Sequence, residues 1–291
     1  MFLPRKILEE RLRNMLAEDL GEGDITTALT VPVGAIAEAE VRFKEPGIVA
    51  GIEESTVLLE SLGLKIQASF RDGEEIRADE VIMKISGDAR TILSVERTLL
   101  NLLSRMSGIA TATRRLVKEI LKAKLKTRIA CTRKTAPGLL YFDKKAVLLG
   151  GGDTHRLHLD DLVLVKDNHI AMAGSLQEAV RTAKERASFS KKVEVEVTSA
   201  ADAVKAAEVG ADIIMLDNFS PRQVEKAMGV LESAGFLGRV LVEASGGITA
   251  ENVLSYASKR VDVVSLGEIT ESSRALDINL KVTTKKPSRR T

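Results

Sequence analysis

Residues 193–217 read VEVEVTSAADAVKAAEVGADIIMLD, and this stretch decides the fold. An apolar strand pattern at residues 193–197 is followed by an amphipathic helical pattern at 199–209 and a second apolar run at 212–216. A strand, a helix and a strand in this order predict two parallel strands joined by a right-handed crossover.

The same alternation extends to both sides of this stretch. Strand patterns also occur at residues 127–131, 162–165, 240–242 and 261–266, and a seventh strand is expected within 150–160. Helical patterns occupy most of the intervals, at residues 138–149, 175–187, 221–234 and 249–257. The candidate functional residues lie at or just past the ends of the strands, so we expect an open or closed α/β barrel. A doubly wound sheet would gather them at one switch point instead.

The first part of the chain has a mixed pattern. Helical spacing at residues 5–18 and 53–61 alternates with strand patterns at 35–48, 65–70 and 81–85. A long helical pattern then runs over residues 91–121, with a break expected near Ser107 and Gly108. We predict a smaller α+β domain at residues 1–107 and a barrel domain at 108–275, with 276–291 a candidate to pack back on the first domain.

Composition excludes several classes of function. Lysine and arginine number 43 and aspartate and glutamate 41, so the net charge is 43 − 41 = +2. This balance argues against nucleic acid or an anionic membrane as a main partner. The single cysteine, Cys131, excludes an intrachain disulfide and is expected to be a buried, inert thiol. No apolar run has membrane-spanning length, and residues 1–6 contain no signal-type stretch, so we expect a cytoplasmic protein.

Basic residues gather in the middle of the chain. Arg133 and Lys134 follow one predicted strand, Arg156 lies in the next loop, and Lys166 follows another strand. Four such groups in one pocket would repel each other, so their gathering predicts an anionic ligand. For any one of them, a surface salt bridge is the simpler interpretation. His155 is a candidate hydrogen-bond donor to a substrate, and the histidine spacing matches no zinc site.

Two carboxylates and two glycine turns complete the predicted site. Glu196 and Asp217 lie at the ends of successive strands, where hard oxygen ligands suit Mg²⁺ or accept ribose hydroxyls. Glu194 alternates with Glu196 on the same face, and spacing alone does not separate the two. The turns at residues 245–247 and 266–268 are expected to bind phosphate through backbone N–H groups, with an ordinary glycine cap as the alternative.

The ordered set of motifs resembles the quinolinate phosphoribosyltransferase family over nearly the whole chain. The resemblance is carried by residues 18–24, 96–103, 107–111, 132–138, 150–156, 166–169, 195–197, 216–218 and 245–247. One departure is Thr154, where the family more often has asparagine.

The resemblance implies an N-terminal α/β sandwich domain and a C-terminal, incomplete α/β barrel. It also implies a homodimer, or a higher homo-oligomer, in which each barrel is covered by the partner's N-terminal domain. The implied reaction joins quinolinate to phosphoribosyl pyrophosphate with loss of CO₂, in NAD biosynthesis. The implied quinolinate ligands are Thr132, Arg133, His155, Arg156, Lys166 and, from the partner subunit, Arg97.

The donor and its metal are assigned in the same way. The resemblance places phosphoribosyl pyrophosphate against Lys134, Lys166, Glu196, Asp217, Ser245, Gly246, Gly247, Leu266, Gly267 and Glu268. It assigns Mg²⁺ to Glu196 and Asp217, and so prefers Glu196 over Glu194.

Three other interpretations compete with this one. A related enzyme could transfer phosphoribose to another pyridine or azole carboxylate. A phosphosugar lyase on a barrel would need a Schiff-base lysine or an acid/base pair. The pattern around residues 47–51 and 81–85 also loosely resembles a biotinyl or lipoyl carrier domain, in which Lys84 would be modified. The strand pattern explains Lys84 without modification.

Overall fold

The chain forms two compact units, and the computed structural model describes residues 3–283. The first unit extends to Thr111 and resumes at Ser273, and the second is Ala112–Ser272. The boundary falls inside helix α4 (Ala89–Lys122), which is continuous over 34 residues. The predicted break near Ser107 and Gly108 is therefore wrong.

Packing explains why small residues occur in the middle of α4. The Ser107 hydroxyl contacts the backbone N and O of Ala50, at 3.1 and 3.2 Å. A Cβ at position 108 would lie 2.1 Å from the carbonyl oxygen of Arg274. Ser107 and Gly108 thus allow close approach of two other segments without interrupting the helix.

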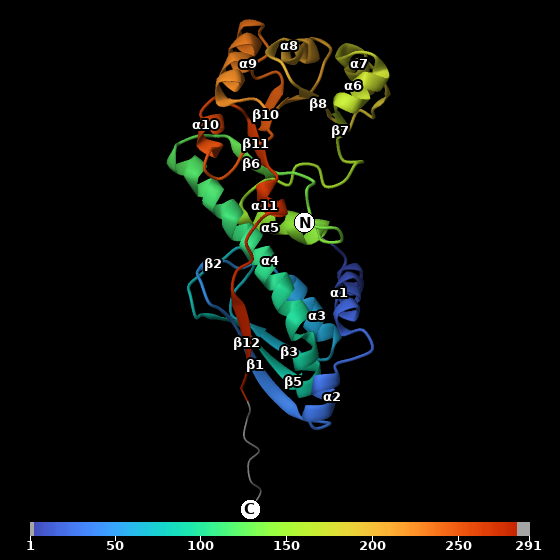
Figure 1. The fold of residues 1–291 in the computed structure, drawn as a ribbon, viewed down its shortest axis with the longest axis vertical. Coiled ribbons are helices and arrows are strands. Elements are labelled where there is room, and N and C mark those ends of the chain that lie inside the picture. The colour runs from blue at the N-terminus through green and yellow to red at the C-terminus, as the bar shows by residue number, and fades with distance from the viewer. Residues whose placement is uncertain (1–2, 284–291) are drawn as a thin grey trace, which may run out of the picture. The chain divides into compact units, whose positions relative to one another are not determined.

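The first unit is built on a four-stranded antiparallel sheet of order β12-β1-β5-β3 (Figure 1). Its strands are β1 (Ile36–Phe43), β3 (Lys65–Ala68), β5 (Val81–Asp88) and β12 (Ile278–Thr283), and β2 (Gly47–Ile48) pairs separately with β4 (Glu75–Ile76). Side chains of β1 alternate between exposed and buried, as expected for a sheet with one covered face. Lys84 lies on β5 and forms an ion pair with Glu40, at 3.4 Å, in agreement with the strand interpretation.

The helices of this unit are α1 (Arg5–Leu20), α2 (Ile25–Thr30) and α3 (Ile52–Ser61). Helix α2 was not predicted, because Ile25 and Leu29 are 74% and 81% exposed and form no buried stripe. Its start is marked by Asp24, whose carboxylate accepts a hydrogen bond from the Thr27 backbone N, at 2.9 Å. Of the segment 276–291, the part in β12 pairs with β1, and residues 284–291 lie outside the described part of the chain.

The second unit contains a six-stranded parallel sheet of order β6-β11-β10-β9-β8-β7 (Figure 1). The strands are β6 (Arg128–Cys131), β7 (Val163–Val165), β8 (Val193–Val197), β9 (Ile213–Asp217), β10 (Leu241–Ser245) and β11 (Val263–Leu266). All six predicted strands are present. Within residues 3–283 the expected seventh is reduced to an isolated bridge between Ala130 and Asp153. This parallel sheet, with β6 and β7 as its edges, agrees with the open α/β barrel that was predicted.

Helices connect the strands on the outside of this sheet. They are α5 (Leu140–Gly150), α6 (Asp167–Ala173), α7 (Leu176–Arg186), α8 (Ala200–Glu208), α9 (Pro221–Ser233), α10 (Val253–Ala257) and α11 (Glu268–Glu271). Helices α7, α8 and α9 pack in succession, and α8 contacts both β8 and β9. The short helices α6 and α11 were not predicted. Among the described residues, no helix combines the length and the apolar character needed to cross a membrane.

Candidate active site

One cavity of about 500 Å³ opens in the second unit, among residues at the carboxyl ends of the parallel strands. Parallel strands all end on the same side of a barrel, so residues far apart in sequence meet there. The cavity brings together most of the predicted site: Thr132, Arg133, Lys134, His155, Arg156, Lys166, Glu196, Asp217, Ser245, Gly246, Gly247 and Gly267.

Three predicted residues do not line this cavity. Arg97 lies on α4 in the first unit, where it is exposed. Leu266 is buried in the core. The carboxylate of Glu268 instead accepts a hydrogen bond from the Ala250 backbone N, at 3.1 Å, and so supports the chain that follows the first glycine turn.

Arg133 follows β6, and Arg156 lies in the loop that leads to β7; both line the cavity. Burial is the main cause that lowers the pKa of Arg156, and the positive charge of Arg133 lowers it further. Two guanidinium groups that repel each other in one cavity favour a bound anion. Arginine binds a carboxylate through two parallel hydrogen bonds, so this end of the cavity suits a small organic acid.

Lys134 and Lys166 line other parts of the cavity wall. Lys166 directly follows β7 and begins α6, where its backbone N donates to Nδ1 of His169, at 3.0 Å. Its ammonium group pairs with Glu196. The Lys134 ammonium lies 3.7 Å from the carboxylate of Glu271. A Cβ at Gly267 would lie 3.1 Å from the Lys134 side chain, so glycine there leaves room for the lysine.

Glu196 and Asp217 extend from adjacent strands, since β8 pairs in parallel with β9. Both line the cavity, and Asp217 accepts a hydrogen bond from the Asn218 amide, at 2.8 Å. Mg²⁺ is commonly bound by one or two carboxylates, several waters and substrate phosphate oxygens. The carboxylate pair fits such an ion.

The first glycine turn is shaped by its neighbour at the end of β9. Gly246 has φ +90°, and a Cβ there would lie 2.3 Å from the Asn218 side-chain oxygen. The Asn218 backbone N also donates to the carbonyl of Ser245, at 2.9 Å. The helix expected directly after this turn begins only at Val253 and is five residues long. A phosphate at this turn would therefore be bound by the N–H groups of the turn rather than by a helix dipole.

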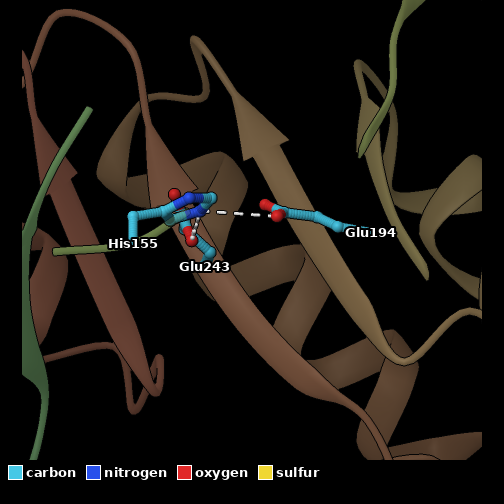
Figure 2. Close-up of side chains that lie close together, drawn as sticks. All are labelled: His155, Glu194 and Glu243. Carbon is cyan, nitrogen blue, oxygen red and sulfur yellow. Dashed lines mark hydrogen bonds and ion pairs between the residues drawn. The ribbon is translucent and has the colours of Figure 1, made fainter. Parts of the chain in front are cut away.

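A buried cluster at the base of the cavity was missed by the sequence prediction. Nε2 of His155 lies 3.0 Å from Glu243 and 3.3 Å from Glu194, and both carboxylates are almost fully buried (Figure 2). Nδ1 accepts a hydrogen bond from the Arg156 backbone N, at 2.8 Å. Both ring nitrogens thus have internal partners in this structure, and His155 also lines the cavity, so its hydrogen bond to a substrate stays a prediction.

Burial and the neighbouring carboxylates shift the pKa of His155 in opposite directions. Burial alone would lower the pKa of His155, but the hydrogen bonds and negative charges of Glu194 and Glu243 raise it to about 10. The Arg156 amide opposes this rise, because it requires a lone pair on Nδ1. Burial raises the pKa of Glu194. Glu194 and Glu196, which sequence spacing could not separate, therefore differ: Glu194 is buried beneath the cavity and Glu196 lines it.

The loop that carries His155 and Arg156 is anchored from helix α5. The ammonium group of Lys144, which is fully buried, donates to the carbonyls of Thr154 and Arg156, the latter at 3.3 Å. Burial lowers the pKa of Lys144. His155 itself has φ +52°, a conformation uncommon for residues other than glycine. Cys131 is buried as expected, and burial raises its pKa, so it is not a reactive thiolate.

Comparisons with known proteins cover both units. Residues 24–107 match the family "Quinolinate phosphoribosyl transferase, N-terminal domain", and residues 109–281 match "Quinolinate phosphoribosyl transferase, C-terminal domain". The chain is 45% identical over 271 residues to the probable nicotinate-nucleotide pyrophosphorylase [carboxylating] of Methanothermobacter thermautotrophicus, which covers 93% of this chain and 97% of that one. It is 36% identical to the human nicotinate-nucleotide pyrophosphorylase [carboxylating], over 97% and 94% of the two chains.

Solved structures give the same result at the level of the fold. The crystal structure of NadC from Streptococcus pyogenes superposes with a TM-score of 0.89 at 35% identity, over 97% of this chain and 99% of that one. The nicotinate-nucleotide pyrophosphorylase of Francisella tularensis superposes with a TM-score of 0.88 at 37% identity, over 97% and 98% of the two chains.

Proposed function

Because this chain belongs to the quinolinate phosphoribosyl transferase family, we propose that it transfers the phosphoribosyl group of phosphoribosyl pyrophosphate to quinolinate. The products are nicotinate mononucleotide, pyrophosphate and CO₂, in the de novo synthesis of NAD. The observation that supports this most directly is one cavity lined by arginines for a dicarboxylate and by two carboxylates and a glycine turn for a phosphorylated donor.

The acceptor end of the cavity suits quinolinate. The positive charges of Arg133 and Arg156 repel each other, and the guanidinium group of Arg156 is partly buried. A dicarboxylate would neutralise both, and the planar guanidinium groups would fix the orientation of the pyridine ring. Lys166 adds a third positive group, although it must share its charge with Glu196. The ring nitrogen of quinolinate is a weak nucleophile, so correct placement supplies much of the rate.

The donor end suits a metal-bound pyrophosphate. Glu196 and Asp217 would hold Mg²⁺, which supplies charge neutralisation to the leaving pyrophosphate. Lys134 also lines the cavity and would add a positive charge for the phosphates. Gly246 and Gly247 line the cavity, and without side chains their backbone N–H groups would be accessible to a phosphate.

The reaction then follows from electron balance. The ring nitrogen forms a bond to the ribose carbon while the bond from that carbon to pyrophosphate breaks. The product is a pyridinium ion, whose nitrogen withdraws electrons from the adjacent carbon. When the 2-carboxylate leaves as CO₂, its bonding pair stays on the ring carbon next to that nitrogen and is then protonated. The pyridinium itself serves as the electron sink for this step.

We also propose that the enzyme works as a homodimer in the cytoplasm, with Arg97 of the partner subunit completing the acceptor site. The support is that Arg97 is an exposed arginine in a family motif, outside the cavity that contains the other predicted acceptor ligands. A two-fold dimer permits each subunit to donate such a residue to the other.

The decisive experiment is incubation with quinolinate, phosphoribosyl pyrophosphate and Mg²⁺, with CO₂ and pyrophosphate measured together. Equal amounts of both products are expected. Nicotinate lacks the 2-carboxylate and would leave an arginine unpaired, so it should be a far poorer acceptor. Comparable turnover of nicotinate, or pyrophosphate release without CO₂, would favour a transferase for another acid. Cleavage of a phosphosugar without pyrophosphate chemistry would favour the lyase.

A further inference from the structure

Asn218 follows directly after Asp217, the last residue of β9, and the sequence did not assign it a role in the site. It lines the cavity, and the chain turns there as it leaves the strand. Its backbone has φ +56°, in the left-handed region, where asparagine is found more often than most other residues. This conformation places the asparagine side chain close to two other parts of the proposed donor site.

The first of these parts is the carboxylate of Asp217. The Asn218 side-chain nitrogen, Nδ2, donates a hydrogen bond to Oδ2 of Asp217, at 2.8 Å. An ionised carboxylate only accepts hydrogen bonds, so the NH₂ end of the amide must be the end that faces Asp217. The bond uses Oδ2 and does not involve Oδ1, which can bind Mg²⁺ or a ribose hydroxyl. Asn218 thereby limits the rotation of the carboxylate.

The second part is the glycine turn at residues 245–247. The three heavy atoms nearest to a Cβ built at Gly246 all belong to Asn218: Oδ1 at 2.3 Å, Cγ at 2.7 Å and the backbone N at 2.8 Å. The backbone N of Asn218 also donates to the carbonyl of Ser245, at 2.9 Å, where β9 and β10 pair with Asp217 opposite Ser245. Asn218 therefore contacts the turn through both its backbone and its side chain.

We propose that Asn218 is a positioning residue that holds the Asp217 carboxylate and the turn at residues 245–247 at a fixed spacing. A single metal-bound, phosphorylated donor must reach both groups at once, so a change in their spacing would weaken its binding. The proposal rests on the proposed function only for the identity of that donor. Asn218 acts through Asp217 and Gly246 and does not need to touch the donor.

A simpler explanation of Asn218 is its backbone conformation alone. Asparagine and glycine both adopt positive φ more easily than other residues, so asparagine could be present only because the chain turns here. In that case Asn218→Gly would have no effect on the reaction. The bond between the amide and the carboxylate is exposed to solvent, so its loss should cost little stability and should be seen in donor binding instead.

Asn218→Gly is the principal test, because glycine keeps the backbone conformation and removes the amide. We expect the KM for phosphoribosyl pyrophosphate and the Mg²⁺ concentration for half-maximal activity each to rise about fivefold, a usual effect of losing one hydrogen bond. The kcat and the quinolinate KM should change little. Lys124→Gly is the matched control, since Lys124 has φ +55° but does not line the cavity, and it should leave both KM values unchanged. An unchanged donor KM in Asn218→Gly overturns the proposal.

Two further variants separate positioning from direct contact with the donor. Asn218→Asp keeps the size of the side chain but cannot donate to Asp217, so it should raise the donor KM at least as much as Asn218→Gly, and must do so even if the glycine variant does not fold. In an Asp217→Ala background, Asn218→Gly should have a smaller effect than in wild type, because no carboxylate is left to orient. Effects that multiply in full would mean that Asn218 binds the donor itself, and would overturn the proposal.

The contact with the turn is tested from its other side. Gly246→Ala would place a methyl group against Asn218, and Asn218→Gly removes two of the three close atoms. The rise in donor KM caused by Gly246→Ala should therefore be smaller in the Asn218→Gly background than in wild type. Gly247→Ala is the control: Gly247 also has positive φ, +62°, but no heavy atom lies within 4 Å of a Cβ there, so its effect should be the same in both backgrounds. Equal effects of Gly246→Ala in the two backgrounds would reject the link to the turn.

Failure of the proposed function is seen separately, as wild-type enzyme that releases no CO₂ and pyrophosphate from quinolinate and phosphoribosyl pyrophosphate. In that case calorimetric titration with Mg²⁺ and inorganic pyrophosphate compares wild type with Asn218→Gly. Weaker binding by the variant supports the positioning role of Asn218. Equal binding, or no binding by either protein, overturns it.

Discussion

Arg156 is held by its backbone on two sides, and its guanidinium is left to face the cavity. Its amide donates to His155 and its carbonyl accepts from Lys144. The side chain is thereby placed beside Arg133, whose charge adds to burial in lowering its pKa. Such placement makes the shape of the side chain important as well as its charge.

Arg156→Lys should therefore not behave as a conservative change. Lysine keeps the charge but cannot form two parallel hydrogen bonds to one carboxylate. We expect kcat/KM for quinolinate to fall by about 10- to 100-fold, with the KM for phosphoribosyl pyrophosphate little changed. Steady-state kinetics with each substrate varied in turn measures this. Unchanged acceptor kinetics would remove Arg156 from the acceptor site.

Asp217→Asn tests the proposed metal site. The residue lies at the rim of the barrel and is only half-buried, so the fold should be retained. Asparagine keeps the size but loses the negative charge, so a higher Mg²⁺ concentration should be needed for half-maximal activity and the donor KM should rise about tenfold. Titration of activity with Mg²⁺ gives both values. An unaltered Mg²⁺ requirement would argue that Asp217 binds ribose instead.

The pH dependence of stability tests the environment of His155. In the unfolded chain this group releases its proton near pH 6.5, whereas in the folded protein its pKa is raised to about 10. Between these values the folded state binds more protons, so its extra stability is complete below pH 6.5 and is lost as the pH rises through 10. Glu243→Gln removes one of the two carboxylates. The stability advantage of wild type over this variant should be greater at pH 6 than at pH 10.5, by about a few kcal/mol.

Denaturant unfolding of both proteins at several pH values provides the measurement. A constant difference across that range would mean that His155 titrates near its ordinary value. Comparison with the variant is needed because burial also shifts the pKa of other groups, lowering that of Lys144.

The sequence predicted the more exposed residues of the cavity better than the buried carboxylates at its base. Arg133, Arg156 and Lys166 were predicted together because each follows a strand or lies in a loop between strands. Glu194 and Glu243 were not predicted as a buried pair, because a glutamate in a strand is normally exposed. Only the register of β8 and β10, together with a histidine from a separate loop, explains how two such groups are kept in the core.

At the scale of elements, regular segments were predicted well and short ones were not. The six parallel strands are short but rich in β-branched and apolar residues, and most are separated by clear helical patterns. Helices α6 and α11 have seven and four residues, too few to show a helical period. The false break in α4 came from judging Ser107 and Gly108 by propensity, whereas tertiary packing decides their identity.

Helix α5 contains three consecutive buried charged residues, Asp143, Lys144 and Lys145. Among them, Lys144 supports the loop of His155 and Arg156. Lys144→Met would keep the length of the side chain and remove both hydrogen bonds. Replacing a buried charge by an apolar group often costs little stability, so the melting temperature should change by only a few degrees.

The loop, however, should lose its anchor in this variant. We expect the quinolinate KM to rise about tenfold, because the Arg156 backbone is no longer fixed. Lys126→Met, at an exposed lysine of the same unit, is the control and should have no effect on either substrate. If Lys144→Met unfolds the protein while its kinetics remain normal at low temperature, Lys144 stabilises the core and does not position the loop.

At the scale of the whole molecule, the main question is whether two chains share each site. The proposal that Arg97 acts across a dimer can be tested with two inactive variants, Arg97→Ala and Lys134→Ala. When their subunits exchange, a mixed dimer contains one site with both changes and one site with neither. Random pairing makes about half of the dimers mixed, so roughly a quarter of wild-type activity should return.

One outcome of the same experiment would contradict the proposal of a shared site. If Arg97 acted within its own chain, every site of a mixed dimer would keep one change and no activity would return. Demonstrated exchange of subunits without recovered activity would therefore reject a shared site. Mixing each variant with itself gives the background.

Strand β12 has a consequence for how the protein is made on the ribosome. It completes the sheet of the first unit by pairing with β1, yet the whole second unit, Ala112–Ser272, is translated between those two strands. The second unit is one uninterrupted segment and can begin to fold as it emerges. The first unit cannot complete its sheet until β12 has been translated. Until then one edge of β1 is unpaired and can pair with other strands. The part of the nascent chain that appears first is thus the part that finishes folding last.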